Sequence, residues 1–304
     1  MHSKKQPKER VVLVTGSSGL IGTALVQALA KKGINVVGCD IKKPPSGNFK
    51  FEKCNLLFKN EVSSLFQRYD FSQVIHLASY VTLGNVNSAE RKKIFRANVV
   101  ATFNLVSAME EHAISRIIFA SSMTVYGFPK YLPVNESHPL DPVGFYGFSK
   151  AAAEEVVKSF SDDYLILRFP GVFAFHRKRG GVYNFILRAI QGKDIHILAD
   201  TPMPWDIIFI DDVVGAITAA LERPAKNAIV NIGYGEPVEL VSLARKIVAL
   251  SGSRSKVIAE QAVGHPVFCL GIKKAETLLG FTPPTLNVRL NQFIDFVKHE
   301  QSSF

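Results

Sequence analysis

The chain has 304 residues, of which 47% are hydrophobic and 20% charged, a composition typical of a folded domain. The formal net charge is +10, but the chain carries no nucleic-acid reader motif, so we expect no nucleic-acid partner. No segment approaches the roughly 20 apolar residues that span a bilayer, and the first ten residues lack the apolar core of a secretion signal. Three scattered cysteines predict free thiols and a cytoplasmic location, with no membrane partner.

A strand and a glycine-rich turn open the predicted fold. Residues 11–14 predict a buried parallel strand, and an amphipathic helix follows the turn. Such a turn lets the backbone approach a pyrophosphate, and the start of the helix offers free N–H groups to that anion. The second strand, residues 35–39, ends at Asp40, where a carboxylate can accept hydrogen bonds from an adenosine ribose. The glycines of this turn are Gly16, Gly19 and Gly22. The turn and Asp40 together predict a dinucleotide site.

Strands and helices continue to alternate as far as residue 168. Further strands are predicted near residues 51–54, 73–77, 116–120 and 164–167. Helices are predicted over residues 57–69, 88–112 and 147–160. The proline-bearing segment 121–145 predicts a loop across the carboxyl edge of the sheet. This alternation predicts a doubly wound parallel α/β sheet, with ligands beyond its carboxyl strand ends.

The pattern is looser from residue 169 onward. Strands are predicted near residues 195–198, 206–209 and 228–232, and helices over 182–191, 211–222, 238–251, 273–279 and 286–299. We therefore divide the chain into a nucleotide-binding domain, residues 1–168, and a smaller C-terminal α/β lobe, residues 169–304. The lobe is expected to bind mainly substrate and to be interleaved with the core.

Two segments carry residues suited to proton transfer. Tyr146 and Lys150 stand one helical turn apart at the start of a predicted helix. A tyrosine with a pKa of about 10 is a poor base at neutral pH, and a neighbouring ammonium group lowers that pKa. Ser121 and Ser122 leave the end of a strand, so a hydroxyl there can bind the substrate oxygen that Tyr146 deprotonates. His76, at the end of another strand, is expected to be a hydrogen-bonded core residue.

With these motifs, residues 11–296 resemble the extended short-chain dehydrogenase/reductases of the NAD-dependent epimerase/dehydratase family, in particular its UDP-glucose 4-epimerase-like members. The matching segments are residues 15–22, Asp40, residues 76–78, Asn98, residues 121–127, Tyr146, Lys150, residues 167–168, residues 211–212 and residues 274–281. The resemblance implies a Rossmann-type fold and a small substrate that is anionic or sugar-like. It also implies a homodimer, for which Ala151, Ala152, Val156 and Val157 are candidate contact or core residues.

The resemblance also implies roles for individual residues. Ser122 would be the catalytic hydroxyl, Tyr146 the base, and Lys150 the group that tunes Tyr146 and holds the nicotinamide ribose. NAD is expected rather than NADP, because the Asp40 carboxylate would repel a 2′-phosphate, although Lys42 lies nearby. No metal is expected. The implied cofactor-binding residues are Gly16, Ser18, Gly19, Leu20, Ile21, Asp40, Asn55, Leu56, Leu77, Ala78, Asn98, Tyr146, Lys150 and Pro170.

The expected substrate pocket departs from the family pattern. Met123 and Thr124 stand where dehydratases place an aspartate and a glutamate, so elimination of water is not expected. Gly171 stands where relatives have an asparagine, and Trp205 where many have an arginine, whose phosphate-binding fork tryptophan cannot replace. The candidate substrate-binding residues are Thr124, Gly171, Arg177, Arg179 and Trp205.

Three functions stay open at this point. The first is an NAD-dependent epimerase of a nucleotide sugar, with the basic residues 177–179 supplying anion contacts. The second is an NAD-dependent dehydrogenase of a smaller hydroxy substrate, such as a free sugar or a sugar acid. The third is a non-catalytic NAD-binding protein with the same fold. Accumulation of NADH separates the first two, because an epimerase returns its hydride.

Overall fold

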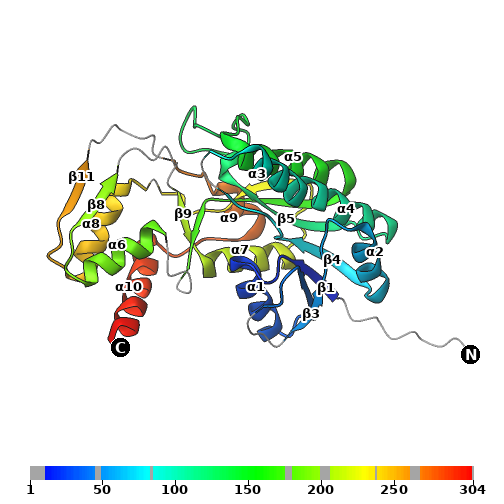
Figure 1. The fold of residues 1–304 in the computed structure, drawn as a ribbon, viewed down its shortest axis with the longest axis horizontal. Coiled ribbons are helices and arrows are strands. Elements are labelled where there is room, and N and C mark those ends of the chain that lie inside the picture. The colour runs from blue at the N-terminus through cyan, green and yellow to red at the C-terminus, as the bar shows by residue number, and fades with distance from the viewer. Residues whose placement is uncertain are drawn as a thin grey trace, which may run out of the picture. The chain divides into compact units, whose positions relative to one another are not determined.

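The structure is a computed structural model that describes residues 11–44, 49–82, 85–174, 180–198, 206–236, 238–260 and 268–302 (Figure 1). The chain divides into two compact units. The first unit comprises residues 1–127, 139–168 and 214–230, and the second comprises residues 128–138, 169–213 and 231–304. The chain passes between the two units five times, after residues 127, 138, 168, 213 and 230.

A seven-stranded sheet forms the centre of the first unit. In spatial order its strands are β10 (Ala228–Asn231), β6 (Asp163–Phe169), β5 (Arg116–Ser122), β4 (Phe71–His76), β1 (Val11–Thr15), β2 (Val36–Asp40) and β3 (Lys50–Lys53). Thr15 lies between Cys39 of β2 and His76 of β4, and both pairings are parallel. The strand order reverses at β1 and β4, and a ligand crevice is expected beyond the carboxyl ends of such neighbours. The predicted doubly wound sheet is confirmed.

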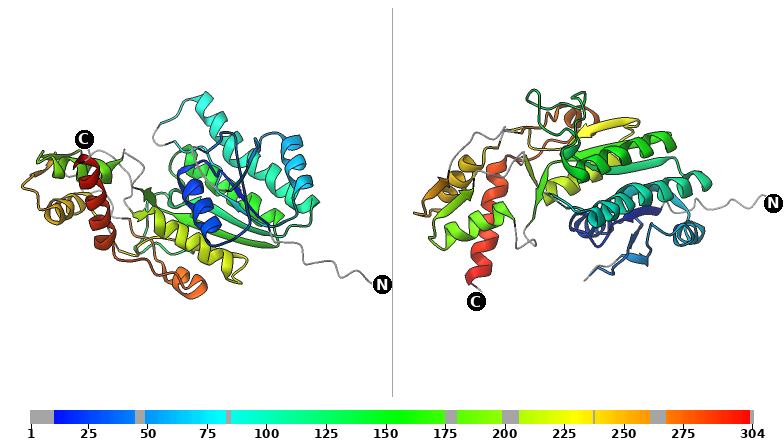
Figure 2. Two further views of the ribbon diagram at one scale, coloured as in Figure 1. Left: turned by 90° about the horizontal axis from the view of Figure 1, so that it is seen from below. Right: turned by 45° about the horizontal axis from the view of Figure 1, so that its top comes forward.

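Helices cover both faces of this sheet (Figure 2). One face carries α1 (Leu20–Lys31) and α7 (Ile210–Glu222), and the other carries α2 (Lys59–Arg68), α4 (Ala101–Glu111) and α5 (Gly144–Phe160). Apolar side chains on the helices pack onto alternate residues of the strands, since burial of apolar surface drives this packing. Members of the resulting core include Leu65 of α2, Leu105 of α4, Val157 of α5, Val74 of β4 and Ile117 of β5.

The predicted helix over residues 88–112 has a change of winding in its middle. α3 (Ser88–Phe95) begins after Asn87, whose side chain accepts a hydrogen bond from the backbone N–H of Glu90. Residues Arg96–Val100 form a π-helical turn, η1, and α4 continues from it. A π-turn adds a residue to the turn and so changes the direction of its side chains, and such turns are frequent at functional sites. The buried residue in the middle of this one is Asn98.

The second unit contains two small parallel sheets. β7 (Gly171–Phe173) pairs with β9 (Ile207–Phe209), and β8 (Ile195–Leu198) pairs with β11 (Val257–Glu260). Its helices are α6 (Gly181–Ile190), α8 (Leu240–Ser251), α9 (Lys273–Leu279) and α10 (Leu286–Ser302). β7 and β11, of 3 and 4 residues, were not predicted from the sequence. Within the described ranges, no helix has the length and apolar character needed to cross a membrane.

Candidate active site

A cavity of about 650 Å³ lies beyond the carboxyl ends of β1, β2 and β4 in the first unit. Gly16 forms part of its floor with a φ of +70°, and a Cβ there would lie 2.6 Å from the backbone nitrogen of Ala78. A Cβ on Gly22 would lie 2.0 Å from the carbonyl oxygen of Gly16. The turn therefore needs glycine at both positions. Because neither glycine has a side chain, the turn packs closely against the residues that follow β4, and its backbone lines the cavity.

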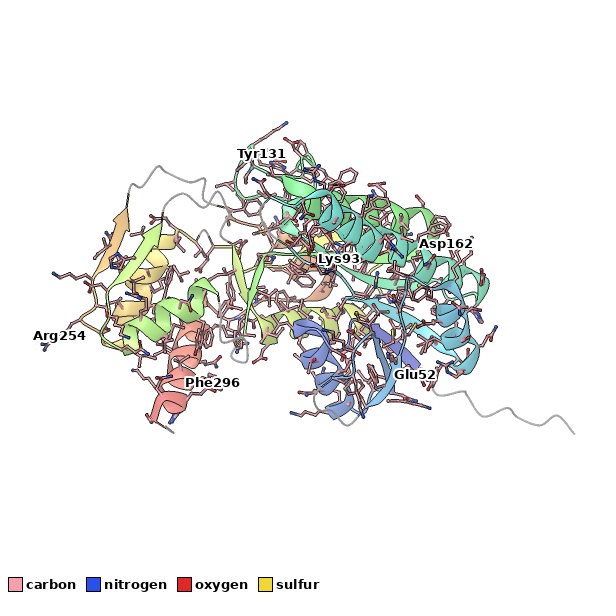
Figure 3. The ribbon with its side chains drawn as sticks, in the orientation of Figure 1. Glu52, Lys93, Tyr131, Asp162, Arg254 and Phe296 are labelled. Atoms are coloured by element: carbon pink, nitrogen blue, oxygen red, sulfur yellow. The ribbon has the colours of Figure 1, made fainter. Side chains whose placement is uncertain are left out.

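The cavity is lined by half of the predicted cofactor-binding residues. Its lining includes Gly16, Gly19, Asp40, Asn55, Leu56, Leu77 and Ala78. Leu20 and Ile21 begin α1 directly after the turn. On another side the cavity is lined by Lys92 and Lys93 of α3, of which Figure 3 labels Lys93, and by Arg96. A glycine turn, an acid at a strand end and basic side chains fit an adenine dinucleotide, which presents a ribose diol and a pyrophosphate.

The Asp40 carboxylate lies at the end of β2, beside the glycine turn. It accepts a hydrogen bond of 3.2 Å from the backbone N–H of Ser18 and another of 3.2 Å from the backbone N–H of Lys42. The two bonds reach different carboxylate oxygens, and each oxygen keeps a further lone pair. Asp40 is therefore held in place and can still accept from the hydroxyls of a ribose.

Tyr146, Ser122 and Lys150 come together where β5 ends and α5 begins. The Tyr146 phenol is hydrogen-bonded to the hydroxyls of Ser122 and Ser79. Burial raises the pKa of Tyr146, and these two hydrogen bonds oppose the rise. The Ser122 oxygen accepts from the Thr124 hydroxyl at 3.0 Å and from its backbone N–H at 3.3 Å, which leaves the Ser122 proton for another acceptor.

Lys150 is buried and follows Tyr146 by one helical turn in α5. Only 3% of it is exposed, and its Nζ lies 4.2 Å from the centre of the Phe119 ring. Burial lowers the pKa of Lys150 to about 7, and the Glu154 carboxylate acts in the opposite direction. A positive charge on this side chain favours the phenolate form of Tyr146. The three predicted catalytic residues can thus supply a base, a hydroxyl donor and a charge that supports the base.

Asn98 connects this group to the loop after β4. Its side-chain carbonyl accepts from the backbone N–H of Tyr80 at 2.7 Å and from the Ser79 hydroxyl at 3.1 Å. Its amide nitrogen donates to the Ser149 hydroxyl at 2.9 Å and to the Tyr80 carbonyl at 3.1 Å. All hydrogen-bonding positions of the amide are used, so the π-turn fixes Ser79 in relation to α5.

His76 is the hydrogen-bonded core residue that we expected. Its Nδ1 lies 2.6 Å from the Thr15 hydroxyl and its Nε2 lies 2.9 Å from the Thr102 hydroxyl. Thr102 donates to the carbonyl of Asn98, so Nε2 carries the proton and Nδ1 accepts from Thr15. Burial lowers the pKa of His76 to about 3, with a further contribution from the nearby Lys150 charge. The neutral ring links the glycine turn to the π-turn.

The predicted substrate residues are distributed over both units. Thr124 binds Ser122 in the first unit. In the second unit, Pro170 is buried, and the N–H of Gly171 donates a 3.0 Å hydrogen bond to the Asp206 carbonyl. The other predicted substrate residues, Arg177, Arg179 and Trp205, lie outside the described residues. Among the described residues, no group of three or more His, Cys, Asp or Glu side chains could hold a metal ion.

Two residues of this site were missed in the sequence. Glu154 follows Lys150 by one helical turn, and an acid on the buried side of an apolar helix was the signal that could have revealed it. Ser79 had no such signal, because its contacts with Asn98 and Tyr146 join segments that are distant in the chain.

Comparisons with known proteins agree with this geometry. A model of the NAD dependent epimerase/dehydratase family matches residues 12–233. A protein of Methanocaldococcus jannaschii, named as a putative UDP-glucose 4-epimerase, is 31% identical over 290 residues, which cover 90% of this chain and 93% of that protein.

Two solved structures are similar over nearly the whole chain. MoeE5 in complex with UDP-glucose and NAD is 28% identical with a TM-score of 0.80, over 95% of this chain and 99% of that chain. A tyrosine-to-phenylalanine mutant of UDP-glucuronic acid 4-epimerase from Bacillus cereus, in complex with NAD and a fluorinated UDP-glucuronic acid, is 26% identical. Its TM-score is 0.81, again over 95% of this chain and 99% of that chain.

Proposed function

The chain belongs to the NAD-dependent epimerase/dehydratase family, and from this premise we propose that it epimerises a nucleoside-diphosphate sugar, with UDP-sugars as the first candidates. The observation that carries the proposal is the meeting of Tyr146, Ser122 and Lys150 at the end of β5 in a unit that also holds a dinucleotide cavity. The relatives named above supply the choice of UDP-sugars, since they are named as UDP-sugar epimerases or bind UDP-sugars.

The cofactor is NAD, and the cavity fits it. We assign the pyrophosphate to the glycine turn and the adenosine ribose to Asp40, with Asn55 and Leu56 near the adenine. When bound, NAD would supply a reversible hydride acceptor for the oxidation of a sugar carbon. The carboxylate of Asp40 also disfavours the 2′-phosphate of NADP, because two negative charges repel each other.

The residues of the chain move the proton. Tyr146 takes the proton from the sugar hydroxyl while the carbon is oxidised, and Ser122 donates a hydrogen bond to the same oxygen. Lys150 stabilises the phenolate form of Tyr146 from which the reaction starts and to which it returns. Tyr146 then returns the proton to the oxygen of the inverted sugar. One base is sufficient for both directions, so no additional acid is required.

The side chains after Ser122 favour epimerisation over elimination of water. Met123 is buried and transfers no proton, and the Thr124 hydroxyl is bound to Ser122. Neither position offers a carboxyl group of the kind that removes a proton from carbon in a dehydratase. The dehydrogenase alternative, with a free sugar or sugar acid as substrate, is not favoured by the relatives.

The test is a substrate screen with two readouts. Purified protein with NAD is incubated with UDP-glucose, UDP-galactose or UDP-glucuronic acid, the sugar epimers are separated by chromatography, and NADH is followed by its absorbance. We expect one of these sugars to give its epimer with no net NADH. Stoichiometric NADH with a free sugar or a sugar acid, and no epimer from any UDP-sugar, would replace this proposal by the dehydrogenase.

We further propose a homodimer in the cytoplasm. Exposed aromatic rings lie on α4 and α5, where Phe103 and Phe160 meet edge to face with their centres 5.3 Å apart. A second copy would cover this apolar surface. Of the earlier candidates Val157 is in the core, whereas Ala151, Ala152 and Val156 are partly exposed. Light scattering at micromolar concentration tests the dimer.

The three cysteines are free and buried, as expected in a reducing compartment such as the cytoplasm.

A further inference from the structure

Glu154 is a fully buried acid in the middle of α5. One of its oxygens accepts hydrogen bonds from the Ser121 hydroxyl and from Nε of Arg168, the latter at 2.9 Å. The other oxygen accepts from Nη2 of Arg168 at 2.5 Å. Ser121 and Arg168 are the second-last residues of β5 and β6, so a single carboxylate joins two strands of the sheet to the helix that carries Tyr146 and Lys150.

Arg168 is also enclosed. It is 1% exposed, and its guanidinium carbon lies 4.7 Å from the centre of the Tyr126 ring. The pair is bidentate, the geometry in which arginine binds carboxylate best. A buried ion pair nevertheless adds little to stability when compared with apolar side chains of the same size, because both charges lose their hydration. Stability alone is therefore a weak reason for a charge at this position.

The second partner of Glu154 is Lys150, one helical turn before it. Burial disfavours the ammonium form of Lys150, and the negative charge of Glu154 opposes this effect. The Phe119 ring and His76, which is neutral, also lie near Lys150. The groups that face Glu154 are Lys150, Arg168 and Ser121, while Tyr126 faces Arg168. Glu154 is thus the anion that supports the charge on Lys150.

We propose that Glu154 is a positioning residue for the reaction: its carboxylate supplies the counter-charge of Lys150 and anchors Ser121, and through it the neighbouring Ser122, at the end of β5. Tyr146, Lys150 and Glu154 follow one another at intervals of one helical turn in α5, so the charge that Glu154 supports is carried by the helical neighbour of the phenol. The inference rests on the proposed function for the reaction that is served, but the charge relationship holds without a substrate.

The test variant removes both charges of the ion pair. Glu154→Gln alone would leave the Arg168 guanidinium buried without a counter-charge, which endangers folding. The double variant Glu154→Gln/Arg168→Gln avoids this, because two amides can hydrogen-bond to each other. Ser121→Ala is the matched control, since it removes the anchor and keeps the charge.

The readout is the ionisation of Tyr146 in the NAD-bound protein. It is followed by phenolate absorbance against pH, with the same titration of a Tyr146→Phe background subtracted. We expect the apparent pKa of Tyr146 to rise by about 1 pH unit in the double variant, because a neutral Lys150 no longer stabilises the phenolate. Ser121→Ala should shift it by much less than half of that amount.

A double variant that melts like the wild type and has an unchanged Tyr146 titration would overturn the proposal. If the double variant does not fold, Glu154→Asp is the test instead. Aspartate keeps the negative charge but shifts the carboxylate that accepts the hydrogen bond from Ser121. Support then requires the wild-type titration of Tyr146, and a shift of a full pH unit contradicts the proposal. Absence of epimerase activity bears on the proposed function alone, since the titration needs no substrate.

Discussion

The Ser79 hydroxyl donates a 3.1 Å hydrogen bond to the side-chain carbonyl of Asn98. The same hydroxyl is bound to the phenol of Tyr146. Asn98 itself is held by Ser149 and by both backbone groups of Tyr80. Ser79 is therefore oriented before any substrate arrives, and its proton can turn toward Tyr146 when the phenol ionises.

Ser79→Ala should lower the fraction of Tyr146 that is ionised, and so able to act as the base, near neutral pH. The loss of one hydrogen bond to the phenolate is worth about 1 kcal/mol, or a factor of roughly five in turnover near neutral pH. The acidic limb of the pH–rate profile should move to higher pH, because the pKa of Tyr146 rises when this bond is lost. Ser64→Ala, at an exposed position of α2, is the control. A pH–rate profile identical to that of the wild type would remove Ser79 from the site.

Tyr146→Phe should abolish proton transfer and leave the fold intact. Loss of a positioned general base lowers turnover by a factor of about 100 or more. NAD binding, measured by calorimetry, should stay nearly the same, since the cavity is lined by other residues. Tyr164→Phe, in a partly exposed position of β6, serves as the control. Retention of most activity would mean that another group is the base.

Asp40 should determine the choice between NAD and NADP. The wild type is expected to bind NAD more tightly, and Asp40→Ala should weaken NAD binding by about tenfold, since bonds to a charged acceptor are worth roughly 1.5–3 kcal/mol. The same substitution should narrow or reverse the preference for NAD over NADP, because the repulsion between the Asp40 carboxylate and the 2′-phosphate disappears. Asp162→Ala removes an exposed acid elsewhere and should have no effect. Equal or tighter NADP binding by the wild type contradicts this prediction.

Arg177 and Arg179 should bind the diphosphate of the substrate if it is a nucleotide sugar. Replacing both by alanine should weaken UDP binding at least about tenfold, since a charge-assisted bond is worth roughly 1.5–3 kcal/mol. NAD binding should barely change. The control is the double replacement of Arg245 and Arg254, two basic residues that are distant from this segment in the sequence. If the wild type bound no nucleoside diphosphate and oxidised a free sugar, the dehydrogenase alternative would hold.

His76 should make the protein sensitive to acid. Its pKa is lowered to about 3 in the folded state, whereas an unfolded histidine titrates near 6.5. The unfolded state therefore binds the proton first, and the free energy of unfolding should fall as the pH drops from about 6.5 toward 3. Urea unfolding at a series of pH values measures this slope. In His76→Gln the slope between pH 6.5 and 5 should be shallower, and an unchanged slope would assign the effect to other groups.

Local features could be predicted from the sequence alone. The glycines of the turn, Asp40 at a strand end and the pair Tyr146 and Lys150 follow from short-range geometry: an apolar strand, a tight turn and the pitch of a helix. Each involves residues that are neighbours in the chain, or that share one strand–turn–helix unit. The order of strands and helices, and with it the doubly wound sheet, followed from the same local patterns.

Contacts between distant segments depended on the tertiary structure. Ser79 meets Tyr146, and Arg168 meets Glu154, only because β4, β5 and β6 end at the same edge of the sheet beside α5. The π-turn that aims Asn98 is likewise invisible in a helical periodicity that continues on both sides of it. Sequence spacing reports which residues share a face of one element. Which faces meet is decided by packing, because burial of apolar surface does not depend on distance along the chain.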